Sequence, residues 1–175
     1  MYFFDVYFID QAGIFIVTTQ ELFQTVQNSD IAIALGQAHI FFGILAQLFH
    51  ISGLILLLTS ILLVNLRLLG VGLTHFSTPE LAKYTKPFVL TGLVFLVISG
   101  LFMLVPSAAL YEPNPAFWLK LKLFAVALVI QFTLYRVVTT ATTPNRLLAI
   151  ITAIISLLLW FSVGLAGRAI GFVAA

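Results

Sequence analysis

The sequence predicts an all-α integral membrane protein, a four-helix bundle with an N-terminal interfacial segment, and three observations indicate this fold. Hydrophobic residues make up 62% of the 175 residues and charged residues only 8%, whereas an ordinary soluble domain has roughly 45–50% and 25%. The mean hydropathy is +1.16. The apolar residues form continuous stretches long enough for membrane helices, rather than the short alternating segments of a transmembrane β-barrel.

The composition also limits the organisation and the chemistry. A chain of 175 residues has room for about four spans and for no second soluble domain. Because there is no cysteine, disulfides, thiolate metal sites, iron–sulfur clusters and covalent c-type haem are excluded. The net charge of +2 gives no indication of a nucleic-acid partner. Motifs of hydrolytic enzymes and the broken-helix repeats of transporters are absent.

Residues 1–29 are predicted to form an interfacial, amphipathic N-terminal segment. Residues 2–17 are aromatic and apolar but are interrupted by acidic and amide side chains, so this stretch is too short and too polar to span a bilayer. Thr18 and Glu21 have the spacing of a capping box, which predicts a short amphipathic helix that ends near Gln27. Ser29 then offers an N-cap for the bundle, which we expect to comprise residues 30–175.

The first span is predicted within a nearly uninterrupted apolar run over residues 31–70. As a helix this run is roughly 60 Å long, twice the thickness of the hydrocarbon layer. The alternatives are one long helix that projects from the membrane or two spans that meet in a tight hairpin. We expect one helix, with residues 42–66 in the membrane, because no proline or Asn-Gly pair marks a turn.

Proline and asparagine residues delimit the other three spans. The second is predicted over residues 87–105, opened by Pro87 at a helix start and closed by Pro106. The third is predicted over residues 117–138. The fourth is predicted over residues 147–172, after a break at Pro144 and Asn145.

The distribution of basic residues predicts the orientation. The positive-inside rule assigns the connections that carry most Lys and Arg to the cytoplasm. These residues flank the first and third connections, whereas the N-terminal region contains acids and no base. We therefore expect a multi-pass protein of the bacterial inner (plasma) membrane with both termini outside. The basic residues behind this prediction are Arg67, Lys83, Lys86, Arg136 and Arg146.

His50 is the main candidate for a functional residue, because an ionisable side chain within a span is costly and usually has a role. It lies roughly 25 Å along the helix from Arg67, which places it in the outer leaflet. Lys120, Lys122 and Arg168 are predicted at the same level on two other helices. These three cations lie on the side of the membrane where the positive-inside rule does not expect them.

A stripe of small and polar residues shares the helix face of His50. Gly43, Ala46, Gln47 and Gly53 recur with it at spacings of three and four. Small residues allow close helix approach, so this face should contact the bundle or a flat ligand rather than lipid. His39 lies roughly 16 Å away on the same run, too far from His50 to share a metal ion with it.

Haem b is the cofactor that this constellation favours. It needs an axial imidazole, an apolar slot lined by small residues, and basic groups for two propionates. The predicted cofactor-binding residues are His50, Lys120, Lys122, Arg168, Gln47, Gly43 and Gly53. A sixth iron ligand would have to come from Met103 or a neighbouring subunit, or be absent. The alternative for His50 is a helix-bridging imidazole bonded to Gln47, Ser99 or a carbonyl, and the alternative for the cations is contact with anionic lipid headgroups.

Polar residues near the inner ends of the helices have a simpler interpretation. Asn65 and Arg67 are expected to anchor the first helix at the inner interface. Gln131, Tyr135 and Arg136 are expected to be their counterpart on the third helix, where they could bind a quinone headgroup. His75, in the connection over residues 70–86, is expected to be a solvated loop residue.

His50 and Gly53, followed by Asn65-Leu66-Arg67-Leu68-Leu69-Gly70, resemble the first helix of small bacterial membrane proteins in the CopD-like and HemJ-like group. Asn114-Pro115-Ala116-Phe117 with Lys120, and Leu159-Trp160 with Ala166-Gly167-Arg168-Ala169-Ile170-Gly171, look like an uncharacterised four-helix family of the same kind. The similarity covers roughly residues 30–172. The resemblance implies a four-helix bundle, and for HemJ-like members haem b ligated by the first-helix histidine, here His50. CopD-like members are associated instead with copper uptake, and this chain departs from the copper pattern in having two Met and no Cys.

Three functions therefore stay open at the level of sequence. The first is a haem-b-binding membrane protein with an electron-transfer or redox role near the outer face. If it is an enzyme, it would be an oxidoreductase, and its partner would be a quinone or a redox protein. The second is a non-catalytic accessory subunit of a larger membrane complex. The third is copper or other metal handling through His39 and His50, which would then serve separate centres. Glycines suited to close packing also suggest a homo-oligomer.

Overall fold

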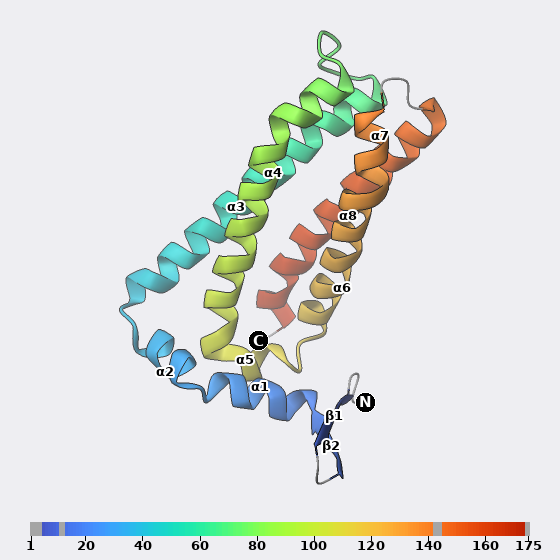
Figure 1. Cartoon of the computed structure of the whole chain (residues 1–175). Coiled ribbons are helices and arrows are strands. Elements are labelled where there is room, and N and C mark those ends of the chain that lie inside the picture. The colour runs from blue at the N-terminus through green and yellow to red at the C-terminus, as the bar shows by residue number, and fades with distance from the viewer. Residues whose placement is uncertain (1–4, 11–12, 142–144, 174–175) are drawn as a thin grey trace.

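The computed structural model describes residues 5–10, 13–141 and 145–173, and it is an all-α membrane bundle with a short N-terminal β-hairpin (Figure 1). Four helical stretches in this part of the chain are long and apolar enough to cross a bilayer: Ile40–Leu69, Thr78–Tyr111, Pro115–Thr140 and Arg146–Val173. The chain is therefore a multi-pass membrane protein, as its composition predicts.

The N-terminal segment begins with strands β1 (Asp5–Asp10) and β2 (Gly13–Thr18), which pair antiparallel. Helix α1 (Thr19–Gln27) follows, and its capping box confirms the predicted start: the Thr18 hydroxyl accepts from the Glu21 N–H at 3.2 Å, and the Glu21 carboxylate accepts from the Thr18 N–H at 3.0 Å. Each strand has six residues and no alternation of polar and apolar residues, so the sequence pattern did not indicate the hairpin.

Helix α1 lies across one end of the bundle, where helix α5 (Ala108–Tyr111) connects the second span to the third (Figure 1). The Thr19 hydroxyl donates to Glu112 at 3.1 Å, and Gln27 accepts from the Ala109 N–H at 2.8 Å. Phe23 packs edge-on against Phe117. The N-terminal segment thus covers this end of the bundle, which we call the capped end.

The expectation of one helix over residues 31–70 is wrong, because the helix breaks at Ala38 and His39. Helix α2 (Asp30–Gln37) begins at the predicted Ser29 cap, and helix α3 (Ile40–Leu69) follows. Ala38 and His39 have extended ψ angles of 151° and 140°, and the His39 Nδ1 accepts from the Phe41 N–H. A histidine side chain thus caps a helix without the residues that usually signal one. The break turns α2 away from α3 and toward the end of the second span (Figure 1).

The second span starts earlier than predicted. Helix α4 (Thr78–Leu104) begins with a capping box between Ser77 and Glu80 and with Pro79 in its first turn, whereas Pro87 lies inside the helix. The expectation that Pro87 opens this span is therefore wrong; membrane helices tolerate such prolines because neighbouring groups satisfy the freed carbonyl. Pro106 does end α4, in a 3₁₀ turn (Val105–Ser107), but the chain continues directly into α5.

The third span contains an irregular turn and the fourth does not. Helix α6 (Pro115–Ile130) passes through a π-helical segment (Gln131–Tyr135) into helix α7 (Arg136–Thr140). Helix α8 (Arg146–Val173) forms the fourth span, and the Asn145 side chain caps its first turn by accepting from the Leu147 and Leu148 N–H groups. The predicted spans 117–138 and 147–172 lie within these stretches.

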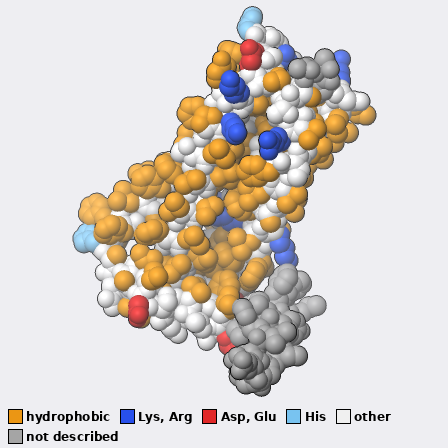
Figure 2. Space-filling view, in the orientation of Figure 1, with side chains coloured by type: hydrophobic (Ala, Val, Ile, Leu, Met, Phe, Trp, Pro, Cys, Tyr) orange, Lys and Arg blue, Asp and Glu red, His pale blue; other side chains and the backbone are white. Residues whose placement is uncertain are grey.

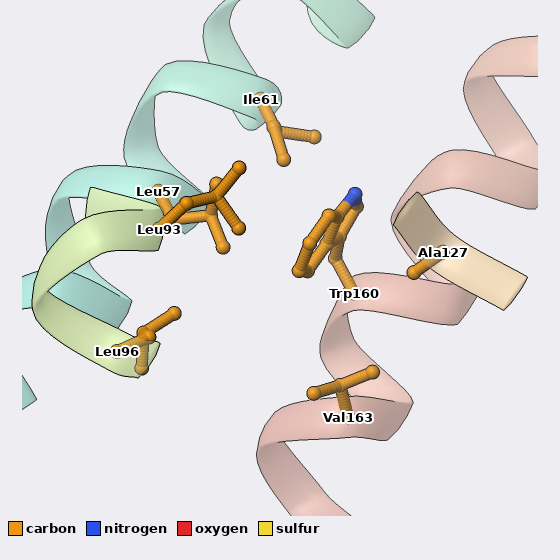
Figure 3. Close-up of a cluster of buried hydrophobic side chains, with 7 residues drawn as sticks. All are labelled: Leu57, Ile61, Leu93, Leu96, Ala127, Trp160 and Val163. Atoms are coloured by element: carbon orange, nitrogen blue, oxygen red, sulfur yellow. The ribbon is translucent and has the colours of Figure 1, made fainter. Parts of the chain in front are cut away.

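The core of the bundle forms around Trp160, which is 1% exposed. Figure 3 shows its indole directed from α8 toward Leu57, Ile61 and Leu93, with Ala127 beside it. Where α3 and α4 meet, Gly53 and Gly92 bring the two backbones together: a Cβ built on either glycine would lie 2.8 Å from the carbonyl oxygen of the other. Large apolar side chains cover the outside of the spans (Figure 2), as expected for helices that contact a lipid bilayer.

Candidate functional site

His50 lies half-buried on α3, in the half of the bundle nearer the capped end, between α4 and α6. Its ring nitrogens have one partner on each neighbouring helix. Nδ1 is 2.9 Å from the hydroxyl of Ser99, on α4, and Nε2 is 3.5 Å from the Nζ atom of Lys120, on α6. The imidazole therefore connects three spans. Ser99 was named as a partner in the helix-bridging alternative for His50, whereas Lys120 was expected at the same level and not as a partner of the ring.

The hydrogen-bond network fixes the tautomer of His50. The Ser99 hydroxyl donates its proton to the Phe95 carbonyl of its own helix, so its oxygen can only accept from the imidazole. Nδ1 therefore carries the proton, and Nε2 presents its lone pair to the Lys120 ammonium, which has protons to donate and no lone pair. This arrangement accommodates a neutral imidazole, because a second proton on the ring would face a cation.

Two glycines leave room for these side chains. A Cβ at Gly100, next to Ser99, would lie 3.4 Å from the His50 ring, and a Cβ at Gly167, on α8, would lie 3.4 Å from the Lys120 stem. Contacts of this length are at the tight end of ordinary van der Waals contact, so both side chains pack directly against a glycine. The sequence analysis treated Gly167 as a close-packing residue and missed Gly100. The position of Gly100 directly after Ser99 is the signal that could have indicated its contact with His50.

Lys120 has His50 as its partner and no carboxylate beside it among the described residues. A cation that is partly buried within a span is expected to find an anion or to reach the interface. Lys122 is exposed two residues further along α6, on a different face. Arg168 is also exposed, with its guanidinium carbon 4.8 Å from the centre of the Phe172 ring. Of the three predicted cations, the structure therefore brings Lys120 to His50.

A groove of about 280 Å³ lies between α2, α3 and the end of the second span. Gly43, Ala46 and Gln47 line it on the face of α3 that leads to His50, and Met103 lines it one turn beyond Ser99 on α4. The predicted stripe thus has two parts: this groove near the capped end, and Gly53, which packs against the α4 backbone. The other residues that line the groove are Leu35, Phe42, Phe102, Pro106 and Tyr111.

The two remaining histidines lie apart from this site. His39 is exposed at the junction of α2 and α3, where its ring stacks on Phe41 with centroids 5.2 Å apart. His75 is exposed in the connection between α3 and α4, as predicted, at the opposite end of the bundle. Neither is placed to ligate a group held by His50.

Three inner polar residues lie in the core rather than at the membrane surface. Asn65 is 0% exposed and donates to the Ser156 hydroxyl at 3.2 Å, so its expected role as an interface anchor is wrong. Gln131 is buried and accepts from the Trp160 indole at 3.3 Å, and Tyr135 is also buried. Both were expected at the interface. Arg67 and Arg136 do reach the surface, and Arg67 donates to the Phe76 carbonyl.

The assigned tautomer gives a direct prediction for solid-state or solution ¹⁵N NMR of the protein in lipid or detergent. We expect the Nδ1 of His50 to show the shift of a protonated ring nitrogen and the Nε2 that of an unprotonated one. In Ser99→Ala this preference should weaken, because one acceptor for the Nδ1 proton is removed while the Lys120 ammonium still faces Nε2. A wild-type spectrum with both nitrogens protonated would contradict the assignment.

Within the described ranges, no three or more His, Cys, Asp or Glu side chains group together in a way that could hold a metal ion. A protein family model described as a family of unknown function (DUF6644) matches residues 21–173, from α1 to the end of α8. No curated protein and no solved structure matches the chain. The matched region includes His50, Ser99, Lys120 and the groove.

Proposed function

The chain belongs to the DUF6644 family, whose function is unknown, and we propose that this protein binds haem b with His50 as its axial ligand and serves in electron transfer or redox chemistry near one membrane face. The observation that carries the proposal is the His50 imidazole, with Nδ1 held by Ser99 and the Nε2 lone pair directed at a lysine that has no carboxylate beside it among the residues the structure describes.

The protonation state of the His50 ring suits an axial haem ligand. A ligating histidine usually donates its second ring N–H to a fixed acceptor, which orients the ring and increases the basicity of the ligating nitrogen. Ser99 is such an acceptor for His50, at 2.9 Å. When bound, haem b would supply one-electron redox chemistry. The protein would hold its iron through a nitrogen that is already unprotonated, so binding requires no proton release from the ring.

Lys120 is the residue suited to a haem propionate. Its Nζ lies 3.5 Å from Nε2, so iron ligation requires the ammonium to move aside. Its stem packs over Gly167, where no side chain blocks it, and four rotatable methylenes allow such a movement. Lys122, near the start of α6, and Arg168, near the end of α8, are exposed toward the capped end of the bundle, where they could meet the second propionate or lipid headgroups.

Other metals are less well supported by the same residues. A zinc or copper site needs several His, Cys or carboxylate ligands around one ion, and the described residues offer no such group. Haem needs as few as one protein ligand, since the macrocycle supplies four nitrogens. The resemblance of the first helix to HemJ-like proteins agrees with a single first-helix histidine.

The proposed location is the bacterial plasma membrane, with the capped end outside. The first connection, between α3 and α4, and the third, between α7 and α8, lie at the opposite end, and Lys and Arg gather there (Figure 2). By the positive-inside rule this end is cytoplasmic. His50 then lies in the outer half of the membrane. There a membrane quinone or an external redox protein could reach it as electron partner. The proposal holds for a single chain and for a homo-oligomer.

The absorption spectrum of the purified protein tests the proposal. The full chain, expressed in cells supplied with haem precursors and purified in mild detergent, should show a Soret band and about one haem b per chain in a pyridine haemochrome assay. The reduced spectrum should differ from the oxidised one. A colourless protein that also fails to take up added haemin would refute the function.

A further inference from the structure

A second polar site lies in the bundle interior, between α3 and α8 and away from His50. Asn65 and Thr152 are both 0% exposed, and Ser156 is 2% exposed. Asn65 Nδ2 donates to the Ser156 hydroxyl at 3.2 Å. Thr152 lies one turn from Ser156 on the same face of α8. Three polar side chains therefore gather where apolar residues would normally fill a membrane bundle.

Two atoms of this cluster are left without a partner among the described residues. They are the Asn65 Oδ1 and the Thr152 Oγ1, both fully buried. A buried polar atom without a hydrogen bond is costly, and more so in a bilayer, where no surrounding water can reach it. Other buried threonines avoid this cost: Thr85, for example, donates to the Leu81 carbonyl of its own helix at 2.9 Å.

We propose that an internal water molecule binds between α3 and α8 at Asn65 and Thr152. Asn65 Oδ1 can only accept, and the Thr152 hydroxyl can both donate and accept, so a water molecule within hydrogen-bond reach of both atoms would satisfy both by donating to the amide oxygen and bonding to the hydroxyl. A sodium or other cation fits less well, because buried charge requires a counter-charge. The four acids of the described helical region, Glu21, Asp30, Glu80 and Glu112, lie at helix starts and in connections rather than in this interior.

The water would join Thr152 to the pair Asn65 and Ser156 and so extend the polar network that holds α3 against α8. The direct Asn65–Ser156 bond joins the two helices at one point, and the bridge through Thr152 adds a second point one turn away. Asn65 and Thr152 lie next to Val64 and Ala153 of the second apolar cluster, further from the capped end along both helices than the core cluster around Trp160. This site is separate from the proposed haem site, so neither proposal depends on the other.

The sign of a stability change tests this proposal. Thr152→Val keeps the shape of the side chain and removes its hydroxyl. If water bridges Asn65 and Thr152, the variant weakens the bridge, and the Tm of the full chain in detergent should fall by about 2–4 °C. If Thr152 has no partner, removing an unsatisfied hydroxyl should leave the Tm unchanged or raise it, which would overturn the proposal.

Thr85→Val is the matched control, because it removes a buried threonine hydroxyl that bonds within its own helix. The Thr152→Val change should lower the Tm more than this control does. A structure of the wild-type chain in nanodiscs or crystals, at a resolution that shows ordered water, gives the second readout. Density within hydrogen-bond distance of both Asn65 Oδ1 and Thr152 Oγ1 supports the proposal, and a direct contact between these two atoms overturns it.

Discussion

Replacing Trp160 with alanine should destabilise the bundle by about 3–5 kcal/mol, the usual cost of removing a large aromatic side chain from a core. The indole is 1% exposed, packs edge-on against Phe124 with centroids 5.9 Å apart, and contacts residues of three other helices. Its Nε1 also donates to Gln131, so the substitution leaves the amide oxygen of Gln131 without this bond. Reversible unfolding in detergent or bicelles measures the loss.

Two further substitutions separate these contributions. Trp160→Phe retains much of the packing and removes the hydrogen bond to Gln131, so it should cost clearly less than alanine does. Phe161→Ala is the control for aromatic truncation on the same helix, because Phe161 is 47% exposed on the lipid-facing surface. An equal loss for Phe161→Ala and Trp160→Ala would show that Trp160 is not central to the core.

Adding one methyl group at Gly53 should also destabilise the bundle, by about 1–3 kcal/mol, as overpacking does in a close contact. A Cβ there would lie 2.8 Å from the Gly92 carbonyl oxygen and from the Phe95 Cβ. The backbone oxygen cannot move aside as a side chain could, so α3 and α4 must separate. Gly92→Ala meets the Gly53 carbonyl at the same distance and should have a similar effect.

Gly43→Ala provides the matched control for this prediction. Gly43 lies on the same helix and the same predicted stripe, but a Cβ there meets nothing within 4 Å. This variant should be as stable as the wild type or slightly more stable, because alanine favours helix over glycine. The combined Gly53→Ala and Gly92→Ala variant should cost less than the sum of the two, since both open one contact. Strict additivity would contradict the close approach.

The class of the fold follows from composition, because a bilayer admits few solutions for such an apolar chain. Local capping signals were also readable: Thr18 with Glu21, and Ser29, start helices as predicted. The break at His39 and the start of α4 at Thr78 were not predicted, since a histidine cap is rare and Pro87 indicated a later helix start while the capping box of Ser77 and Glu80 was missed.

Part of the candidate site was also predictable from the sequence. Depth along a helix can be counted from sequence, and this count brought Lys120 to the level of His50. Azimuth on a neighbouring helix cannot be counted before the packing is known, so Lys122 and Arg168 were assigned to the site with equal weight. Asn65 and Gln131 were misplaced at the interface because a polar residue near a helix end has the same sequence pattern whether it faces water or the core.

The most direct test of the central claim replaces each of the three histidines in turn and records the haem spectrum of each purified variant. His50→Ala should lose the Soret band or shift it to that of weakly bound haem, while His39→Ala and His75→Ala, at exposed positions outside the site, should match the wild type. Added imidazole should restore a ligated spectrum to His50→Ala. A Soret band that is unchanged in His50→Ala would contradict the assignment of this residue as the axial ligand.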